Sequence, residues 1–259
     1  MSIRAAIFDI YDTLLEVGPA PADAAQRWEG LWQTMLGTPI PLTLAVFATE
    51  CSRLVTRDHD AARAIGVTYP EVFWPQIVAE VRPELAALSP EARNEFVFQH
   101  AQLRHTVRLM PEAADVLKAF DHSRILLGVA SNAQPYTVRE LEQALKGVGL
   151  SSKLFNPALC FFSFEVGFSK PDPHFFRLLA TRLRLMGVQP AETLLIGNCP
   201  ENDVVPAQAQ GWQIWHLTGD GENPEVQTGA WGKLGGWFGE RRRKKPQIPT
   251  SKPQINTKH

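Results

Sequence analysis

Residues 5–15 read Ala5-Ala6-Ile7-Phe8-Asp9-Ile10-Tyr11-Asp12-Thr13-Leu14-Leu15. Four apolar residues lead directly into Asp9, and two further polar groups, Asp12 and Thr13, follow it. This pattern is typical of a buried parallel strand that carries an aspartate nucleophile to its carboxyl end. Such an aspartate can form an acyl intermediate, while a nearby hydroxyl and backbone N–H groups hold an oxyanion. The alternative is an aspartate that caps the turn after a strand, and the stretch alone leaves both open.

Length and composition indicate a globular protein. The 259 residues suffice for one large domain or for a core with an inserted second one, and 44% of them are apolar. The formal net charge of -1 and the 20% of charged residues provide no general attraction for a polyanion. We therefore expect neither a nucleic acid nor a membrane as partner.

The cysteines favour a reducing compartment. Cys51, Cys160 and Cys199 are odd in number and form no closely spaced pair, so a disulfide framework or a zinc site is not expected. The N-terminal apolar run is broken early by Asp9 and Asp12, which does not match a signal peptide or a membrane span. The sequence therefore predicts a cytoplasmic protein.

Residues 18–105 are predicted to be all-helical. The sequence Gly18-Pro19-Ala20-Pro21 ends the first strand pattern, and no strand periodicity follows it in this region. Pro75 and Pro83 are expected to kink or divide the third of the candidate helices. These helices cover residues 22–35, 41–57, 71–88 and 89–105.

From residue 110 onward, helices alternate with buried strands. Apolar runs predict strands at 125–130, 159–162, 193–197 and 213–217, the last being the final strand, with helices between them. This order predicts an α/β fold with a doubly wound, mostly parallel sheet and an inserted all-α domain. The expected division is a core of residues 1–17 and 106–220, a helical domain of residues 18–105, and a C-terminal extension of residues 221–259.

The C-terminal extension departs from the alternating pattern. Residues 219–239 are glycine-rich and include the large apolar residues Trp231, Trp237 and Phe238, and the basic run Arg241-Arg242-Arg243-Lys244-Lys245 then opens a polar end. A short charged terminus is usually a solvated tail, so we expect its end to be disordered.

Polar side chains follow three separate predicted strands, and a lysine lies in the loop before the helix predicted at 174–186. Because the carboxyl ends of strands in an open α/β sheet form the ligand crevice, these side chains should converge. Such a set suits transfer of a phosphoryl or similar group through a covalent aspartyl intermediate. Its members are Asp9 with Thr13, Ser131 with Asn132, Lys170, and Asn198 with Asp203.

The order of these segments resembles the haloacid dehalogenase superfamily over nearly the whole chain to about Leu217. The four segments that resemble its motifs are Phe8-Asp9-Ile10-Tyr11-Asp12-Thr13-Leu14, Val129-Ala130-Ser131-Asn132, Ser169-Lys170-Pro171-Asp172-Pro173 and Ile196-Gly197-Asn198-Cys199-Pro200-Glu201-Asn202-Asp203. The helical insert stands where many members of this family carry a cap that closes over the site.

The resemblance implies a role for each residue of the set. Asp9 would be the nucleophile, while Thr13, Ser131 and Lys170 would bind the substrate anion and the developing charge, with Tyr11 as a further catalytic residue. Asn132 together with Thr13 would contact the substrate. Asp203 would orient Lys170 or support a Mg²⁺ site made with Asp9 and Asn198.

Two positions depart from the phosphatases of this family. Tyr11 stands where they carry an aspartate that protonates the leaving group, and Asp12 is an alternative proton donor. Asn198 stands where they carry a magnesium-binding aspartate, and a neutral amide weakens such a site because Mg²⁺ prefers anionic oxygen ligands. Both residues match the 2-haloacid dehalogenase branch, which needs no metal, whereas Glu201-Asn202-Asp203 resembles the phosphatase version.

Three functions therefore stay open at this point. The preferred one is a hydrolase of the phosphatase type that acts on a small phosphomonoester and uses Mg²⁺. The second is a metal-independent hydrolase that resembles the 2-haloacid dehalogenases. The third is a member of the family that binds a metabolite without turnover. In each case the partner is a small, anionic molecule, and the protein is expected to be a monomer or a homodimer.

Overall fold

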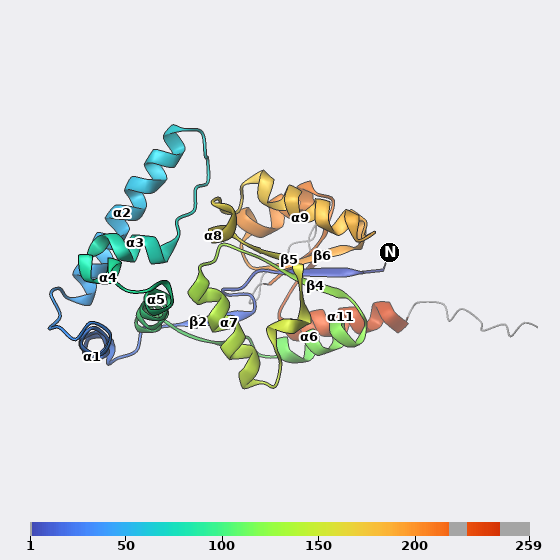
Figure 1. Ribbon diagram of the computed structural model, residues 1–259. Coiled ribbons are helices and arrows are strands. Elements are labelled where there is room, and N and C mark those ends of the chain that lie inside the picture. Colours follow the sequence, from blue (N-terminus) through green and yellow to red (C-terminus); the bar gives the residue numbers. More distant parts are fainter. Residues whose placement is uncertain (1, 218–226, 244–259) are drawn as a thin grey trace, which may run out of the picture.

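The computed structural model describes residues 2–217 and 227–243. Its main sheet has six strands in the order β5-β4-β1-β6-β7-β8, and every neighbouring pair is parallel. Figure 1 shows helices on both faces of this sheet. The predicted doubly wound α/β fold is thus confirmed. The strands are β1 (Ala5–Phe8), β4 (Leu126–Ser131), β5 (Phe155–Phe162), β6 (Thr193–Gly197), β7 (Gln213–His216) and β8 (Gln227–Thr228).

Strand β1 lies at the centre of the sheet and is buried on both faces. Because successive side chains of a strand point to opposite faces, Ala6 and Phe8 join one apolar layer and Ala5 and Ile7 the other. The first layer is covered by α6 (Ala113–His122), α7 (Pro135–Gly147) and α11 (Trp231–Arg243), the second mainly by α9 (Pro173–Leu185). The short elements on the remaining connections are α8 (Ser163–Val166), a π-helical turn (Pro200–Val204) and α10 (Val205–Ala209).

Five helices form a separate helical unit, which lies beside the sheet in Figure 1. The unit has its own apolar core, in which the rings of Trp28, Trp32, Phe47 and Phe96 pack at centroid distances of 4.9 to 6.1 Å. Within the described residues, no helix is both long and apolar enough to span a bilayer. The five helices are α1 (Ala24–Leu36), α2 (Leu44–Ala64), α3 (Trp74–Val81), α4 (Pro83–Ala86) and α5 (Pro90–Arg104).

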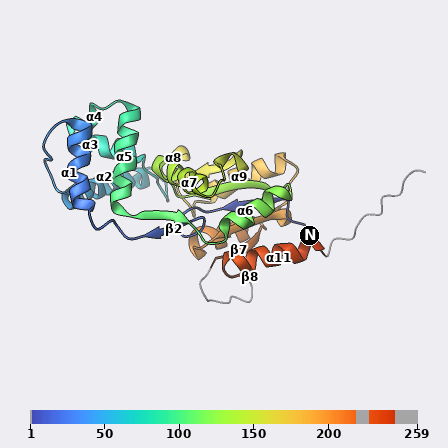
Figure 2. The same ribbon diagram turned by 90° about the horizontal axis from the view of Figure 1, so that it is seen from below.

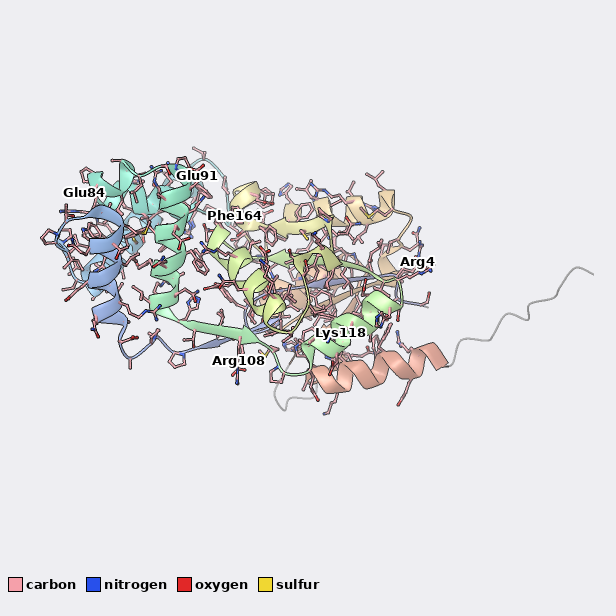
Figure 3. The ribbon with its side chains drawn as sticks, turned by 60° about the horizontal axis from the view of Figure 1, so that its bottom comes forward. Arg4, Glu84, Glu91, Arg108, Lys118 and Phe164 are labelled. Atoms are coloured by element: carbon pink, nitrogen blue, oxygen red, sulfur yellow. The ribbon has the colours of Figure 1, made fainter. Side chains whose placement is uncertain are left out.

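A two-stranded antiparallel ribbon connects the helical unit to the core, and the sequence analysis missed it. It pairs β2 (Leu15–Gly18) with β3 (Thr106–Leu109). Figure 2 shows β2 between the helical unit and the sheet, and Figure 3 shows Arg108 on the same ribbon. Gly18 was interpreted as a break, but it pairs with Thr106, where an added Cβ would lie 2.5 Å from the Thr106 Oγ1. A larger residue at this position would therefore have to displace the Thr106 hydroxyl.

The third predicted helix begins later than expected. Residues 71–73 are not helical, and Pro75 lies in the first turn of α3, where its missing N–H costs no hydrogen bond. The prediction that Pro75 kinks the helix is therefore wrong, whereas Pro83 does open a separate helix, α4.

The segment expected to be a separate tail contributes to the core. Strand β8 follows β7, so the strand at 213–217 is not the last one. Trp231, Leu234 and Phe238 of α11 are buried against the sheet, and Trp231 stacks on Phe8 with 6.0 Å between ring centroids. Figure 2 shows α11 alongside α6. The glycines of this segment hid its helical periodicity, and Lys244, Lys245 and the predicted disordered end lie outside the described residues.

Candidate active site

Polar side chains gather at the carboxyl edge of three adjacent strands. Strand β1 pairs with β4 on one side and with β6 on the other, so Asp9, Ser131 and Asn198 follow neighbouring strands. Lys170 reaches this edge from the loop before α9. Its Nζ donates to Asp9 Oδ1 at 2.8 Å and to Asp203 Oδ1 at 2.5 Å. The structure therefore brings together residues that lie up to 194 positions apart, as the strand-end argument predicts.

Lys170 and Asp203 form a buried ion pair whose charges affect each other. Their side chains are 2% and 1% exposed. Burial lowers the pKa of Lys170, but the carboxylates of Asp9 and Asp203 outweigh it and raise the pKa above its usual value. Burial raises the pKa of Asp203, and Lys170 counteracts this. The ammonium thus stays charged at neutral pH and bridges the two carboxylates.

Asp203 is held in place by the loop after β6. Its Oδ2 accepts a hydrogen bond from the backbone N–H of Cys199 at 3.1 Å. An added Cβ at Gly197 would lie 2.5 Å from the same oxygen, so only glycine lets the carboxylate approach the strand end. The close packing of Asp203 against the end of β6 therefore explains why residue 197 is a glycine.

Thr13 and Asn198 lie against each other at the same edge. The Thr13 hydroxyl, which is fully buried, donates to Asn198 Oδ1 at 3.2 Å. The backbone carbonyl of Thr13 accepts from Trp231 Nε1 at 3.0 Å. The loop that follows Asp9 is thus fixed on one side by the β6 loop and on the other by α11.

Ser131 and Asn132 occupy the end of β4. Ser131 is its last residue and is 1% exposed. The Asn132 amide binds the backbone of Lys170 at both ends: Nδ2 donates to the carbonyl at 3.0 Å, and Oδ1 accepts from the N–H at 2.7 Å. In the structure Asn132 fixes the loop that carries Lys170, and its expected contact with the substrate stays a prediction.

The Tyr11 side chain is bound to α7 and not to Asp9. Its hydroxyl donates to Glu140 Oε2 at 2.5 Å and accepts from Thr137 Oγ1 at 3.2 Å. Burial raises the pKa of Tyr11, and the Glu140 carboxylate raises it further. Sequence reasoning missed Glu140, although the spacing of Thr137, Glu140 and Leu141 places it on the buried face of a helix.

A segment of the helical unit docks on the core beside this site. Glu71 Oε2 accepts from the Ser163 hydroxyl at 2.6 Å, and its Oε1 accepts from Gln134 Nε2 at 3.2 Å. Gln134 Oε1 accepts from the Trp74 N–H at 2.8 Å. Figure 3 shows Phe164 where the two units meet, and its ring lies 6.1 Å from that of Phe73. The non-helical residues before α3 are therefore an attachment point.

The side chains predicted to hold Mg²⁺ do not offer it a complete set of ligands. Both carboxylate oxygens of Asp203 are engaged, by Lys170 and by the N–H of Cys199. Asn198 supplies only a neutral amide beside Asp9. Within the part of the chain that the structure describes, no group of three or more His, Cys, Asp or Glu side chains could hold a metal ion. Because Mg²⁺ keeps several waters and needs only one or two carboxylates together with a substrate phosphate, Asp9 and the Asn198 amide would hold it weakly, and the predicted site stays a prediction.

Comparisons with known proteins agree with this architecture. A family model described as haloacid dehalogenase-like hydrolase matches residues 3–211. The phosphoserine phosphatase of Thermus thermophilus is 33% identical over 133 residues, which is 51% of this chain and 50% of that protein. The chain thus aligns with about half the length of this curated relative.

Two solved structures share the fold over most of the chain. A 2-haloacid dehalogenase from Pseudomonas syringae pv. Tomato is 20% identical, covers 92% of this chain and 99% of its own, and has a TM-score of 0.59. A HAD phosphatase from Thermococcus onnurineus is 19% identical, covers 92% of this chain and 98% of its own, and has a TM-score of 0.53. The TM-scores show that the fold is shared. One of the two proteins is named as a dehalogenase and the other as a phosphatase, so the shared fold does not decide between these activities.

Proposed function

Since this chain belongs to the haloacid dehalogenase-like hydrolases, we propose that it hydrolyses a small phosphomonoester through an acyl phosphate formed on Asp9. The observation that carries the proposal is the contact of Lys170 Nζ with Asp9 Oδ1 at 2.8 Å. A buried cation at the carboxyl edge of the central strand orients the carboxylate and attracts an anionic substrate. The similarity to a phosphoserine phosphatase supports a phosphate ester as the substrate class.

The proposed chemistry has two displacements at phosphorus. An Asp9 carboxylate oxygen attacks the phosphorus atom, the bond from phosphorus to the alcohol oxygen breaks, and that oxygen leaves as the alcohol after taking a proton. Water then attacks the phosphorus of the aspartyl phosphate, loses a proton, and releases inorganic phosphate and free Asp9. Lys170 and the Thr13 and Ser131 hydroxyls lie at the strand ends, where developing charge on the phosphoryl oxygens needs donors.

The helical unit acts as the cap in this proposal. It is attached to the core by the β2–β3 ribbon and by the contacts of Glu71 and Trp74 with Gln134. A unit attached in this way, and also by α5 against α7, would cover the site at the strand ends and admit small substrates. Closure over a site excludes water and strengthens the electrostatic contacts inside it.

A second candidate is hydrolysis of a carbon–halogen bond. The observations that favour it are the binding of the Tyr11 hydroxyl to Glu140 and the incomplete set of magnesium ligands. In this reaction an Asp9 oxygen attacks carbon, halide leaves with the bonding electrons and needs no proton, and water hydrolyses the resulting alkyl ester. Such a reaction uses neither a general acid for the leaving group nor a metal.

A substrate panel separates the two candidates. The purified protein is incubated with p-nitrophenyl phosphate, phosphoserine and 2-chloropropionate, each with Mg²⁺ and with chelator. Phosphate release that disappears in Asp9→Asn supports the phosphatase, and Asp9-dependent halide release supports the second candidate. Release of neither product from the panel at high enzyme concentration contradicts both proposals.

The fate of labelled water provides an independent distinction. During turnover in water enriched in heavy oxygen, attack at phosphorus places the label in inorganic phosphate. Hydrolysis of an alkyl ester at its carbonyl carbon instead places the label in the Asp9 carboxylate. Mass spectrometry of the peptide that contains Asp9 therefore reports which bond water attacks.

A further inference from the structure

Glu140 is a fully buried carboxylate outside the group of Asp9, Lys170 and Asp203. Its side chain is 0% exposed and lies in the middle of α7. An ionised carboxylate without partners is very unfavourable in such a place, so its hydrogen bonds decide whether the local arrangement is stable.

Three hydrogen-bond donors from different segments converge on Glu140. Tyr11 donates from the loop after β1 at 2.5 Å, Gln102 Nε2 from the last turn of α5 at 2.5 Å, and His105 Nε2 from the junction of α5 and β3 at 3.0 Å. The rings of Tyr11 and His105 also meet edge to face, 5.6 Å apart. One carboxylate thus joins the active-site loop, the helical unit and the ribbon that connects them.

Further contacts hold α7 against the helical unit. The guanidinium of Arg139 pairs with Glu95 of α5 at 2.5 Å and lies 3.8 Å from the ring centroid of Phe98. Thr137 donates to Tyr11 from the preceding turn. Because α7 begins four residues after Ser131, the same helix leads back to the catalytic strand ends.

We infer that Glu140 is a positioning residue that couples the seating of the helical unit to the placement of the Tyr11 loop beside Asp9. If the helical unit moves away, Glu140 loses the donors Gln102 and His105. If Tyr11 leaves, the same carboxylate loses its contact with the active-site loop. Each contact therefore favours the other, since a buried charge with part of its partners missing is destabilised.

The inference predicts a loss of substrate affinity with little change in the chemical step. When the seated arrangement is only partly populated, apparent affinity falls by the populated fraction, whereas saturating substrate restores that arrangement. For Glu140→Gln with p-nitrophenyl phosphate, KM should rise about tenfold while kcat stays within about twofold. This kinetic readout rests on the proposed function.

A second readout does not depend on activity. Hydrogen–deuterium exchange should be about tenfold faster in Glu140→Gln at the amides of β3 and the last turn of α5, with β1 unchanged. Gln102→Ala removes one donor and leaves the carboxylate, so it should show the same local change with a smaller amplitude, and it serves if Glu140→Gln does not fold. The matched control is Glu142→Gln, because Glu142 lies on the same helix and makes a solvent-exposed bridge to Lys146.

The double variant Tyr11→Phe with Glu140→Gln tests the coupling itself. If the two side chains act as one unit, exchange at β3 and KM in the double variant should equal those of Glu140→Gln alone. Unchanged exchange at β3 in folded Glu140→Gln and Gln102→Ala, or additive effects in the double variant, would overturn the inference. If the unmodified protein shows no turnover but the variants show the expected faster hydrogen exchange, only the proposed function is contradicted.

Discussion

The Tyr11 hydroxyl donates to the Glu140 carboxylate at 2.5 Å, although 129 positions separate the two residues. Burial, and then the charge of Glu140, raise the pKa of the phenol above its ordinary value. A phenol with a raised pKa stays protonated at neutral pH and is a weak acid, and its proton lies toward Glu140. Tyr11 therefore holds the loop after β1 against α7 through its hydrogen bond to Glu140.

Removal of divalent metal should leave turnover nearly unchanged. Both oxygens of Asp203 are engaged, and Asn198 carries no charge, so Mg²⁺ would find a single free carboxylate ligand at most. We expect rates with chelator and with Mg²⁺ to agree within about twofold. The measurement is product release across a magnesium titration. A strict requirement for Mg²⁺ would contradict this prediction.

Substitution of Lys170 by methionine should strongly destabilise the protein at neutral pH. It leaves Asp9 and Asp203 as neighbouring buried charges without their common cation, which costs about 3 kcal/mol or more of the free energy of unfolding. Urea denaturation measures this loss. Lys118→Met on α6 is the control, because Lys118 is exposed on the outer surface (Figure 3).

The loss of stability caused by Lys170→Met should be smaller at acidic pH. Without the ammonium, burial and the charge of Asp9 raise the folded-state pKa of Asp203 unopposed. The folded variant therefore binds a proton at Asp203 more tightly than the unfolded chain does. Its stability relative to the unmodified protein therefore rises as the pH falls toward about 4. An equal difference at pH values near neutrality and near 4 would contradict this electrostatic explanation.

His100 should make the protein sensitive to acid. It is 1% exposed, its ring lies 5.7 Å from that of Trp28 and 5.1 Å from that of Phe47, and neither ring nitrogen has a hydrogen-bond partner among the described residues. Burial, with a smaller contribution from Arg104, lowers the pKa of His100 to about 3. The folded state thus keeps this imidazole neutral inside the aromatic core.

The sign of the effect follows from proton binding. Below its ordinary pKa of about 6.5 the unfolded chain binds a proton at His100 and the folded chain does not, so stability falls as the pH drops through this range. His100→Phe should remove that loss, amounting to about 2 kcal/mol at a pH near 5. Urea denaturation of the unmodified protein and of His100→Phe, at neutral pH and near pH 5, measures this difference. If both proteins lose the same free energy of unfolding between the two pH values, His100 is not the source of the acid sensitivity.

Substitution of Trp231 by alanine should affect both stability and the active-site loop. It removes a buried ring stacked on Phe8 and the hydrogen bond to the Thr13 carbonyl, at a cost of about 3 to 5 kcal/mol. Trp237→Ala on the same helix is the control, because Trp237 is only partly buried and should lose less. Thermal denaturation measures both. Equal losses would contradict a special role for Trp231.

The local sequence determined the parallel core and the polar edge at the carboxyl ends of its strands. Apolar runs that end in Asp9, Ser131 and Asn198 encode buried strands, because such runs are stable only when both faces are covered. The rule that parallel strands present their carboxyl ends together then placed Lys170 and Asp203 with them, and the ion pairs agree with that expectation. The helical unit was likewise recognisable from proline and capping signals such as Ser89, which accepts from the Ala92 N–H.

Only the tertiary structure decided how these parts are joined. The β2–β3 ribbon, the docking of Glu71 on Ser163 and the packing of α11 depend on partners far away in the chain, and short or glycine-rich segments carry little local preference for such contacts. The same holds for Asn132, whose amide binds Lys170, and for Tyr11, which binds Glu140. Local sequence encodes periodicity and turns, whereas the hydrogen-bond partner of a buried polar group is set by which segments pack around it.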